Sequence, residues 1–428
     1  MEEWRRWLAS LIPGSSSIPR SALAVLLVYS FSSQFLPIEP YFVPYITSVK
    51  KFTNHQVTVD IFPISVYSQL IFTLLMAPVC LYLSHKVLII LGAFGLLITY
   101  LIVWIGQSLL AMQIMQITYG FGASTRLVFS SYIFLLVSEE EYQTMTSLTT
   151  TISLLSFMLS SELGQLLALQ EAPYDIFFVI SLIALGICCS MTFILPKDHS
   201  LSSLSSLTNS WDQSKQGWTS VLKETWHGRS LQIFSLWWAV AFAGISLVQN
   251  YGTNLFEAVD PKSKLNGHIL AASELAASLG SYCAIYIEKF ASKSCLSIYM
   301  VGSALMGILC VCMGFSSKIW VAYCLYVIIC GIYQTLACLV SVRCGHLISN
   351  GQYILLFSIN SFAGLLVETL LQAAIEISGL SIFSQFISFS GFFFLATAIC
   401  VGLCFVDSSR TSYLVLETEP EHLISDST

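Results

Sequence analysis

Charged residues are scarce in this chain of 428 residues: Asp, Glu, Lys and Arg make up only 10% of it, whereas 56% is hydrophobic. Soluble globular domains carry about 25% charged residues. The composition therefore excludes an ordinary water-soluble fold. We expect a protein that sits in the lipid bilayer and has no nucleic-acid partner.

Motifs for catalysis and for metal binding are also missing. The sequence contains no HExxH, no GxSxG, no phosphate-binding loop and no clustered pair of carboxylates. Most of the 13 cysteines lie in apolar stretches, and Cys310 and Cys312 have no second pair or nearby His with metal-ligand spacing. We therefore expect neither an enzyme nor a resident metal or cofactor.

Long apolar stretches are abundant. A membrane-spanning helix needs about 20 apolar residues, and twelve stretches of this kind alternate with short polar breaks. They cover residues 21–46, 57–83, 87–106, 109–137, 143–168, 175–195, 231–257, 266–288, 295–315, 318–342, 352–376 and 381–406. The pattern predicts an all-α membrane protein, a bundle of 12 transmembrane helices in two six-helix halves, as in the major facilitator superfamily.

The basic residues predict how this bundle is oriented. Cytoplasmic loops carry an excess of Lys and Arg. With the N-terminus inside, twelve of the 18 basic residues fall on the cytoplasmic side and five on the outer side, while Arg126 lies within the bilayer. The expected parts are a cytoplasmic N-terminus (1–20), an N-terminal half (21–196), a cytoplasmic central loop (197–229), a C-terminal half (230–407) and a cytoplasmic tail (408–428). The plasma membrane is the default location.

Arg126 belongs to a polar stripe in the fourth span. The spacings between its members are three or four residues, which places them on one face of a helix: Gln116, Tyr119, Ala123, Arg126 and Ser130. A charge at this depth costs about 2.5–3.5 kcal/mol and persists mainly where it faces a cavity or a partner. Two interpretations remain open for Arg126: contact with a ligand, or a structural ion pair with Glu39 of the first span.

Further polar groups lie within other predicted spans. They are the acids Glu39, Glu162, Glu274 and Glu368 and the neutral residues Asn250, Tyr251 and Asn360. Glu162 is near the outer end of its span, where a packing or capping role is expected. Four acids against one arginine indicate either protonated carboxyls or a cationic or mixed-charge solute. Glu274 and Glu368 are candidates for proton coupling or gating.

Short motifs that occur in order along the chain point to a family. They are PIEPYFVPYI (37–46), AMQIMQITYG (111–120), RLVFSSYIF (126–134), YQ (142–143), LGQLL (163–167), SLWW (235–238), GIYQ (331–334) and FSINSF (357–362). This set resembles the reduced-folate and thiamine carrier family of the major facilitator superfamily. The resemblance implies transport of a water-soluble vitamin by alternating access, with the ligand between the two halves.

The motifs do not choose one vitamin. The segment that begins at Arg126 resembles the folate branch, where an arginine faces the glutamate tail of folate, and the resemblance implies that role for Arg126. The thiamine branch is matched at Glu39-Pro40 and at Asn250-Tyr251, which implies that these residues bind the ligand together with Gln116 and Tyr119. The chain departs from family positions at Gln116 (a glutamate in both branches), Cys330 (an arginine) and Glu368 (a lysine in the folate branch).

Four readings therefore remain open. Thiamine and reduced folates are close alternatives, and a mixed-charge relative such as a phosphorylated thiamine is a third. The fourth is a membrane sensor that binds the vitamin without moving it. The oligomeric state is left undetermined.

Overall fold

The computed structural model describes residues 19–53, 55–196, 223, 225–226, 228–260, 265–291, 295–348 and 352–417, and these ranges contain no β-strand. Most of the expected cytoplasmic N-terminus, most of the central loop and the last residues of the tail lie outside them. The elements are α2 (Arg20–Ser32), η1 (Glu39–Tyr41), α3 (Phe42–Ser48), η2 (Gln56–Ile61), α4 (Phe62–Tyr82), α5 (His85–Ile105), α6 (Leu109–Leu136), η3 (Glu139–Glu141), α7 (Tyr142–Leu169), α8 (Tyr174–Ile194), α11 (Arg229–Val259), α12 (Asn266–Ala291), α13 (Cys295–Gly314), α14 (Ile319–Leu347), α15 (Tyr353–Ser378) and α16 (Ile382–Glu417).

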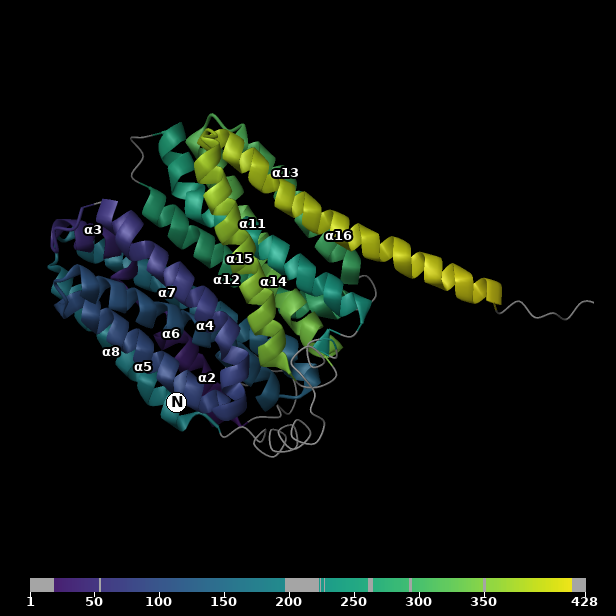
Figure 1. The fold of residues 1–428 in the computed structure, drawn as a ribbon, viewed down its shortest axis with the longest axis horizontal. Helices are drawn as coiled ribbons and strands as arrows, with labels where there is room; N and C mark the ends of the chain where they lie inside the picture. The colour runs from purple at the N-terminus through teal and green to yellow at the C-terminus, as the bar shows by residue number, and fades with distance from the viewer. Residues whose placement is uncertain are drawn as a thin grey trace, which may run out of the picture.

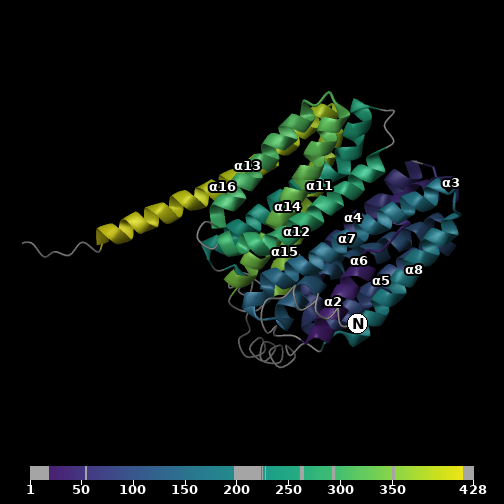
Figure 2. The same cartoon turned by 180° about the vertical axis from the view of Figure 1, so that it is seen from behind.

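Two helical halves lie side by side, one drawn in purple to blue and the other in green to yellow (Figures 1 and 2). They meet where α7 packs on α12 and where α4 packs on α15. The prediction of an all-α bundle in two halves is confirmed. Following the orientation expected from the basic residues, we call the ends where α3 stops and α4 starts the outer ends, and the opposite ends the inner ends.

Ten helices in the described ranges are long and apolar enough to cross a membrane by length and composition. The two other expected spans differ for identifiable reasons. Polar residues interrupt the apolar run of α6, Arg126 above all. The first span is broken into α2, η1 and α3, because its three prolines lack the backbone N–H that an uninterrupted helix needs.

The break in the first span leaves backbone carbonyls without helical partners, which is costly in a membrane unless other groups bond to them. Nearby groups supply some of those bonds, and three serines on one face of α7 add others. Ser156 Oγ donates to the carbonyl of Phe31 at 2.6 Å. Ser153 and Ser160 donate likewise, to Ser30 at 3.3 Å and to Gln34 at 3.4 Å. The serines thereby hold the broken segment against α7.

Serine side chains also mark where two other spans begin. Ser84 Oγ accepts a hydrogen bond from the backbone N–H of Val87 at the start of α5, and Ser108 Oγ accepts one from Ala111 at the start of α6. Such caps satisfy N–H groups that have no partner within the helix. At the other end of the chain, α16 continues to Glu417, beyond the boundary expected at residue 407.

Close packing of α12 on α14 depends on Gly280. A Cβ added there would collide with the backbone carbonyl oxygen of Gly331 and with Thr335 Oγ1, and a backbone atom cannot swing aside. We expect Gly280→Leu to lower the midpoint of thermal unfolding of the detergent-solubilised protein by several degrees, because overpacking destabilises helix contacts. Gly186→Leu is the control, since a Cβ at Gly186 meets no atom within 4 Å. Equal midpoints for the two variants would contradict the packing argument.

Candidate functional site

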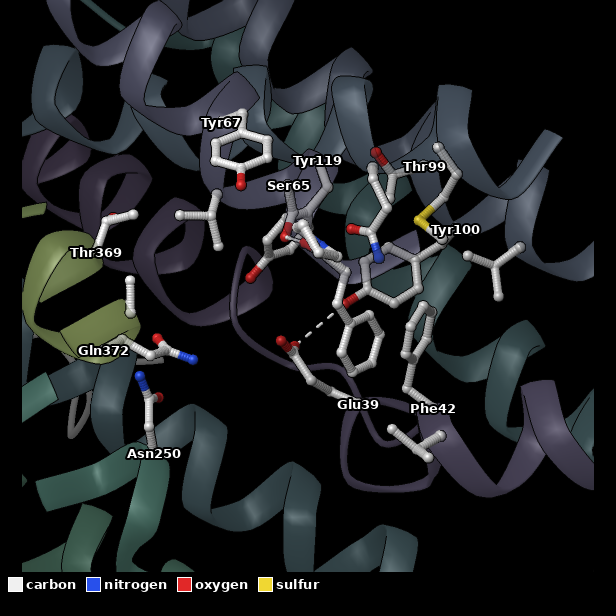
Figure 3. Close-up of a pocket in the computed structure, with 18 residues that line it drawn as sticks. Glu39, Phe42, Ser65, Tyr67, Thr99, Tyr100, Tyr119, Asn250, Thr369 and Gln372 are labelled. Carbon is white, nitrogen blue, oxygen red and sulfur yellow. Dashed lines mark hydrogen bonds between the residues drawn. The ribbon is translucent and has the colours of Figure 1, made fainter. Parts of the chain in front are cut away.

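A cavity of about 740 Å³ lies between the two halves, in the outer part of the bundle. Its walls come from the first span and from α4, α5, α6, α11 and α15. Figure 3 shows Glu39 and Tyr100 on one side and Asn250, Thr369 and Gln372 on the other. Binding cavities for small molecules have volumes of about 300–1,000 Å³ and a few well-placed polar groups in an apolar wall. This cavity has both properties.

Glu39 is the only charged residue among those that line this cavity in the described part of the chain. It opens the short helix η1 directly after the break in the first span, so the break is what brings its carboxylate to the cavity wall. Tyr100 Oη of α5 donates a hydrogen bond to Glu39 Oε2 at 3.1 Å (Figure 3). One carboxylate oxygen therefore has a fixed partner on the protein.

Gln116 and Tyr119 of α6 line the same cavity. The helix can carry them there because it lies very close to α4: a Cβ on Gly120 would come within 2.8 Å of the backbone nitrogen of Gln69. The glycine thus admits a neighbouring helix. Ser68 Oγ adds a bond to the carbonyl of Gln116 at 3.2 Å.

Asn250 lines the cavity from α11, and its Nδ2 donates to Glu368 Oε1 of α15 at 3.0 Å. Glu368 does not itself line the cavity; it orients the amide. Tyr251, the neighbour of Asn250, packs against Phe389 of α16 with ring centroids 5.8 Å apart and is not one of the lining residues. The structure therefore brings Asn250 to the expected ligand residues and places Tyr251 elsewhere.

Arg126 lies in a second, smaller cavity of about 210 Å³ between α2, α6 and α7. In the described ranges it makes no ion pair within 4.0 Å, although the Glu39 carboxylate is near enough to interact with its charge over a longer distance. The polar stripe of α6 thus serves two cavities. Gln116 and Tyr119 face the large one, and Arg126 and Ser130 face the small one.

The small cavity is rich in hydroxyl groups. Its polar lining consists of Tyr29, Ser30, Ser33, Gln34, Arg126, Ser130, Thr146, Thr149, Thr150 and Ser153. Two of these hydroxyls, Ser30 Oγ and Thr146 Oγ1, are buried and have no hydrogen-bond partner among the described residues. Buried polar groups in proteins are nearly always bonded. A guanidinium beside unpaired hydroxyl donors has the chemistry of a site for a negatively charged group.

Glu274 lies on α12 in the C-terminal half and lines neither cavity. Its charge acts on Tyr326 and Cys330 of α14, so it belongs to the interior of that half. Of the two residues expected to couple or gate transport, Glu368 is therefore beside the large cavity and Glu274 is apart from it.

Aromatic rings close the inner ends of the helices. Tyr142, at the start of α7, and Tyr353, at the start of α15, share a hydrogen bond of 2.9 Å between their hydroxyls. Phe134 packs on both rings, with centroids 4.6 and 5.3 Å apart. His346 and Phe357 extend the cluster. We call these five residues the inner seal, and it joins the two halves on the side away from the large cavity.

Several lining residues were missed in the sequence. Thr369 and Gln372 are three residues apart on α15, and that helical spacing of polar residues is the signal that could have found them. Tyr100 gave no such signal, because an aromatic residue in an apolar span is usually packing. Ser65 and Tyr67 of α4, and Phe42 of α3, likewise required the folded arrangement.

Comparison with known proteins identifies the family of this chain. Residues 20–204 and 197–388 match the family described as Reduced folate carrier. Thiamine transporter 1 of Homo sapiens is 27% identical over 442 residues, with 88% of each chain covered. The reduced folate transporter of Rattus norvegicus is 27% identical over 425 residues, covering 90% of this chain and 82% of that protein.

The fold has a solved counterpart in FucP, a Major Facilitator Superfamily transporter whose crystal structure is in the outward conformation. The TM-score is 0.68 at 12% identity, with 89% of this chain and 96% of that chain covered. The fold is therefore that of a major facilitator, a multi-pass membrane protein. Because the residues that match this family make up most of the sequence, the chain belongs to the reduced folate carrier family.

Proposed function

We propose that this protein carries thiamine, or a close relative of it, across a membrane by alternating access. The observation that supports this most directly is the large cavity between the halves, where Glu39 is the single charged lining residue among those that the structure describes. A carboxylate attracts a cationic ring. The surrounding amide and tyrosine groups offer hydrogen bonds to the edge of a heteroaromatic base. Relatives named as thiamine transporters and as reduced folate transporters make both vitamins candidates.

Charge favours thiamine over a folate in this cavity. A reduced folate carries carboxylates, which would meet Glu39 without any basic residue among the described side chains that line the large cavity. Like charges in a cavity walled by protein repel more strongly than in water. The amide of Gln116, in place of the family's glutamate, removes one negative charge but adds no positive one.

A specific observation supports a second candidate, a solute with one cationic and one anionic end, such as a phosphorylated thiamine. Gln116 and Arg126 are ten residues apart on α6, a rise of about 15 Å. The ring of such a solute would occupy the large cavity while its anionic end approached the guanidinium and the unpaired hydroxyls of the small one.

Alternating access requires that the two ends of the bundle open in turn. In this structure the large cavity lies toward the outer ends, and the inner seal joins the two halves. This arrangement corresponds to the outward-facing state of the transport cycle. We propose that Glu368 contributes to the cycle by breaking and forming its hydrogen bond with Asn250 as α15 moves. We further propose Glu274 as a proton acceptor within the C-terminal half.

Time-resolved uptake tests this function. Vesicles that contain the purified protein are supplied with labelled thiamine or labelled reduced folate, and the internal volume is varied. We expect thiamine to accumulate in proportion to that volume. Saturable binding without dependence on volume would identify a sensor instead of a carrier. We propose that the protein is located in the plasma membrane, where uptake by intact cells would measure its transport.

Arg126→Ala distinguishes the two candidate solutes. We expect the variant to transport thiamine within about twofold of the parent chain, because the large cavity keeps its carboxylate and amides. Inhibition of this uptake by thiamine monophosphate should weaken about tenfold or more, since hydrogen bonds between charged partners contribute about 1.5–3 kcal/mol. The inhibition constants of thiamine and thiamine monophosphate, measured for both chains, provide the test. An equal loss of affinity for both ligands would contradict a role specific to the anion.

A further inference from the structure

One ion pair crosses the boundary between the two halves in the described part of the chain. Glu162 Oε1, near the outer end of α7, lies 3.1 Å from His268 Nδ1, in the first turn of α12. The side chains are 39% and 44% exposed, so both reach water. Glu162 is thus more than the packing or capping residue that the sequence predicted.

The pair lies at one end of a long contact between α7 and α12. Further toward the inner ends, Ser278 Oγ donates to the carbonyl of Thr151 at 3.1 Å, and Ser281 Oγ donates to the carbonyl of Ser147 at 3.0 Å. These bonds are between neutral groups that do not titrate near pH 7. The hydrogen bonds between α7 and α12 therefore include a titratable pair at the outer end and neutral bonds further in.

A chain of contacts leads from this pair to the large cavity. Gln165 is one turn after Glu162 on α7, and its Oε1 accepts a hydrogen bond from Tyr41 Oη at 2.6 Å. Tyr41 belongs to η1, the three-residue helix that begins with Glu39. This hydrogen bond couples the outer end of α7 to the segment that carries Glu39, the only charged lining residue of the cavity in the described ranges.

The charges around the pair are few. Tyr41 of η1 is near enough to feel the charge of Glu162, and Tyr174 of α8 is near Tyr41. On α12 itself, the next ionisable residue in the described part is Glu274, almost two turns further along. Neither Glu162 nor His268 makes a second ion pair within the described residues. Protonation of His268 therefore changes the interaction with Glu162 more than any other.

We propose that Glu162 and His268 form a pH-sensitive latch between the outer ends of the two halves, which holds them together when His268 is protonated and restricts entry to the large cavity. The proposal rests on alternating access through this cavity but is independent of which solute is carried. Histidine is the side chain whose charge changes between about pH 5 and 8. The latch is therefore tested at pH 5.5, where we expect it to be engaged, and at pH 8, where we expect it to be released.

The size of the effect follows from the exposure of the pair. Ion pairs that reach water are weakened by solvent, so we expect engagement of the latch to slow access to the cavity about threefold. At 1.4 kcal/mol per factor of ten, this corresponds to about 0.65 kcal/mol. The change is small but measurable as a ratio of rates.

Labelling of a cysteine placed in the cavity measures access without requiring transport. Ala373 of α15 lines the cavity and is exposed there. We would compare the rate at which a membrane-impermeant thiol reagent modifies Ala373→Cys in the parent chain and in a chain that also carries His268→Gln. The ratio of the two rates cancels the effect of pH on the thiol, and the chain without Ala373→Cys gives the background of native cysteines.

The expected result is labelling about threefold slower in the parent than in His268→Gln at pH 5.5, and equal rates at pH 8. Glu162→Gln should behave like His268→Gln, whereas His268→Lys should label slowly at both values. Glu171→Gln, just beyond the same end of α7 and outside the ion pair, is the matched control and should follow the parent. A rate ratio that stays flat from pH 5.5 to 8 in both Gln variants would overturn the latch. Loss of thiamine transport with an intact pH-dependent ratio would overturn the proposed function alone.

Discussion

Glu39→Gln is expected to lower thiamine uptake at low substrate concentration by about 30-fold or more, with little change in the amount of protein in the membrane. Glu39 is the only charged lining residue of the large cavity in the described part of the chain. Removing one partner of a desolvated charge pair costs about 2–5 kcal/mol, and about 2 kcal/mol is a factor of about 30. Glutamine keeps the size of the side chain and can still accept the hydrogen bond from Tyr100.

The measurement is the initial rate of uptake as a function of thiamine concentration, normalised to protein at the cell surface. The loss should appear mainly in KM, because the carboxylate contributes to binding. Glu140→Gln is the matched control, since that acid is exposed in the three-residue helix η3, away from the cavity. Uptake by Glu39→Gln within threefold of the parent would contradict a cationic ligand at this carboxylate.

Covalent bridging of the inner seal is expected to stop transport almost completely while leaving the cavity open to the outside. Tyr142 and Tyr353 come from opposite halves and are joined by a hydrogen bond of 2.9 Å. The halves must separate there for a solute to leave on the inner side. In the variant with Tyr142→Cys and Tyr353→Cys, a short bifunctional thiosulfonate reagent should reduce uptake to background, and a reducing agent should restore it.

The two expected outcomes of the bridging experiment, loss of uptake and an open cavity, each have a control. The two single-cysteine variants should keep their uptake after treatment, which excludes bridges to the native cysteines, such as Cys344 near the end of α14. Labelling of Ala373→Cys from the outside should continue in the bridged protein. If bridged protein still transports at its earlier rate, separation of the inner ends at this point is not part of the cycle.

The sequence predicted the helical architecture well because the physical signal is strong. A run of about 20 apolar residues has few stable alternatives to a membrane helix, and the boundaries of most spans agree with the structure to within a few residues. The exceptions have local causes. The prolines break the first span, and α16 continues past residue 407 because nothing in its sequence forces the helix to stop where the apolar run ends.

The candidate site was only partly predictable. A single helix face can be read from residue spacing, so Gln116, Tyr119 and Arg126 were recognised together. Their division between two cavities could not be foreseen, because it depends on how α2 and α7 pack against α6. The hydrogen-bond partner of Glu39 could not be predicted from the sequence either. Tyr100 is 61 residues away on another span, and spacing within one helix carries no information about such contacts.

The serine face of α7 has a consequence for how the protein is made. The carbonyls at the break of the first span, at Ser30, Phe31 and Gln34, accept hydrogen bonds from nearby groups and additional ones from serines that are 123 to 126 positions later in the chain. During synthesis the first span therefore enters the bilayer well before its partners exist. The break that places Glu39 is completed only when the fifth span arrives, so the N-terminal half matures as one unit and not span by span.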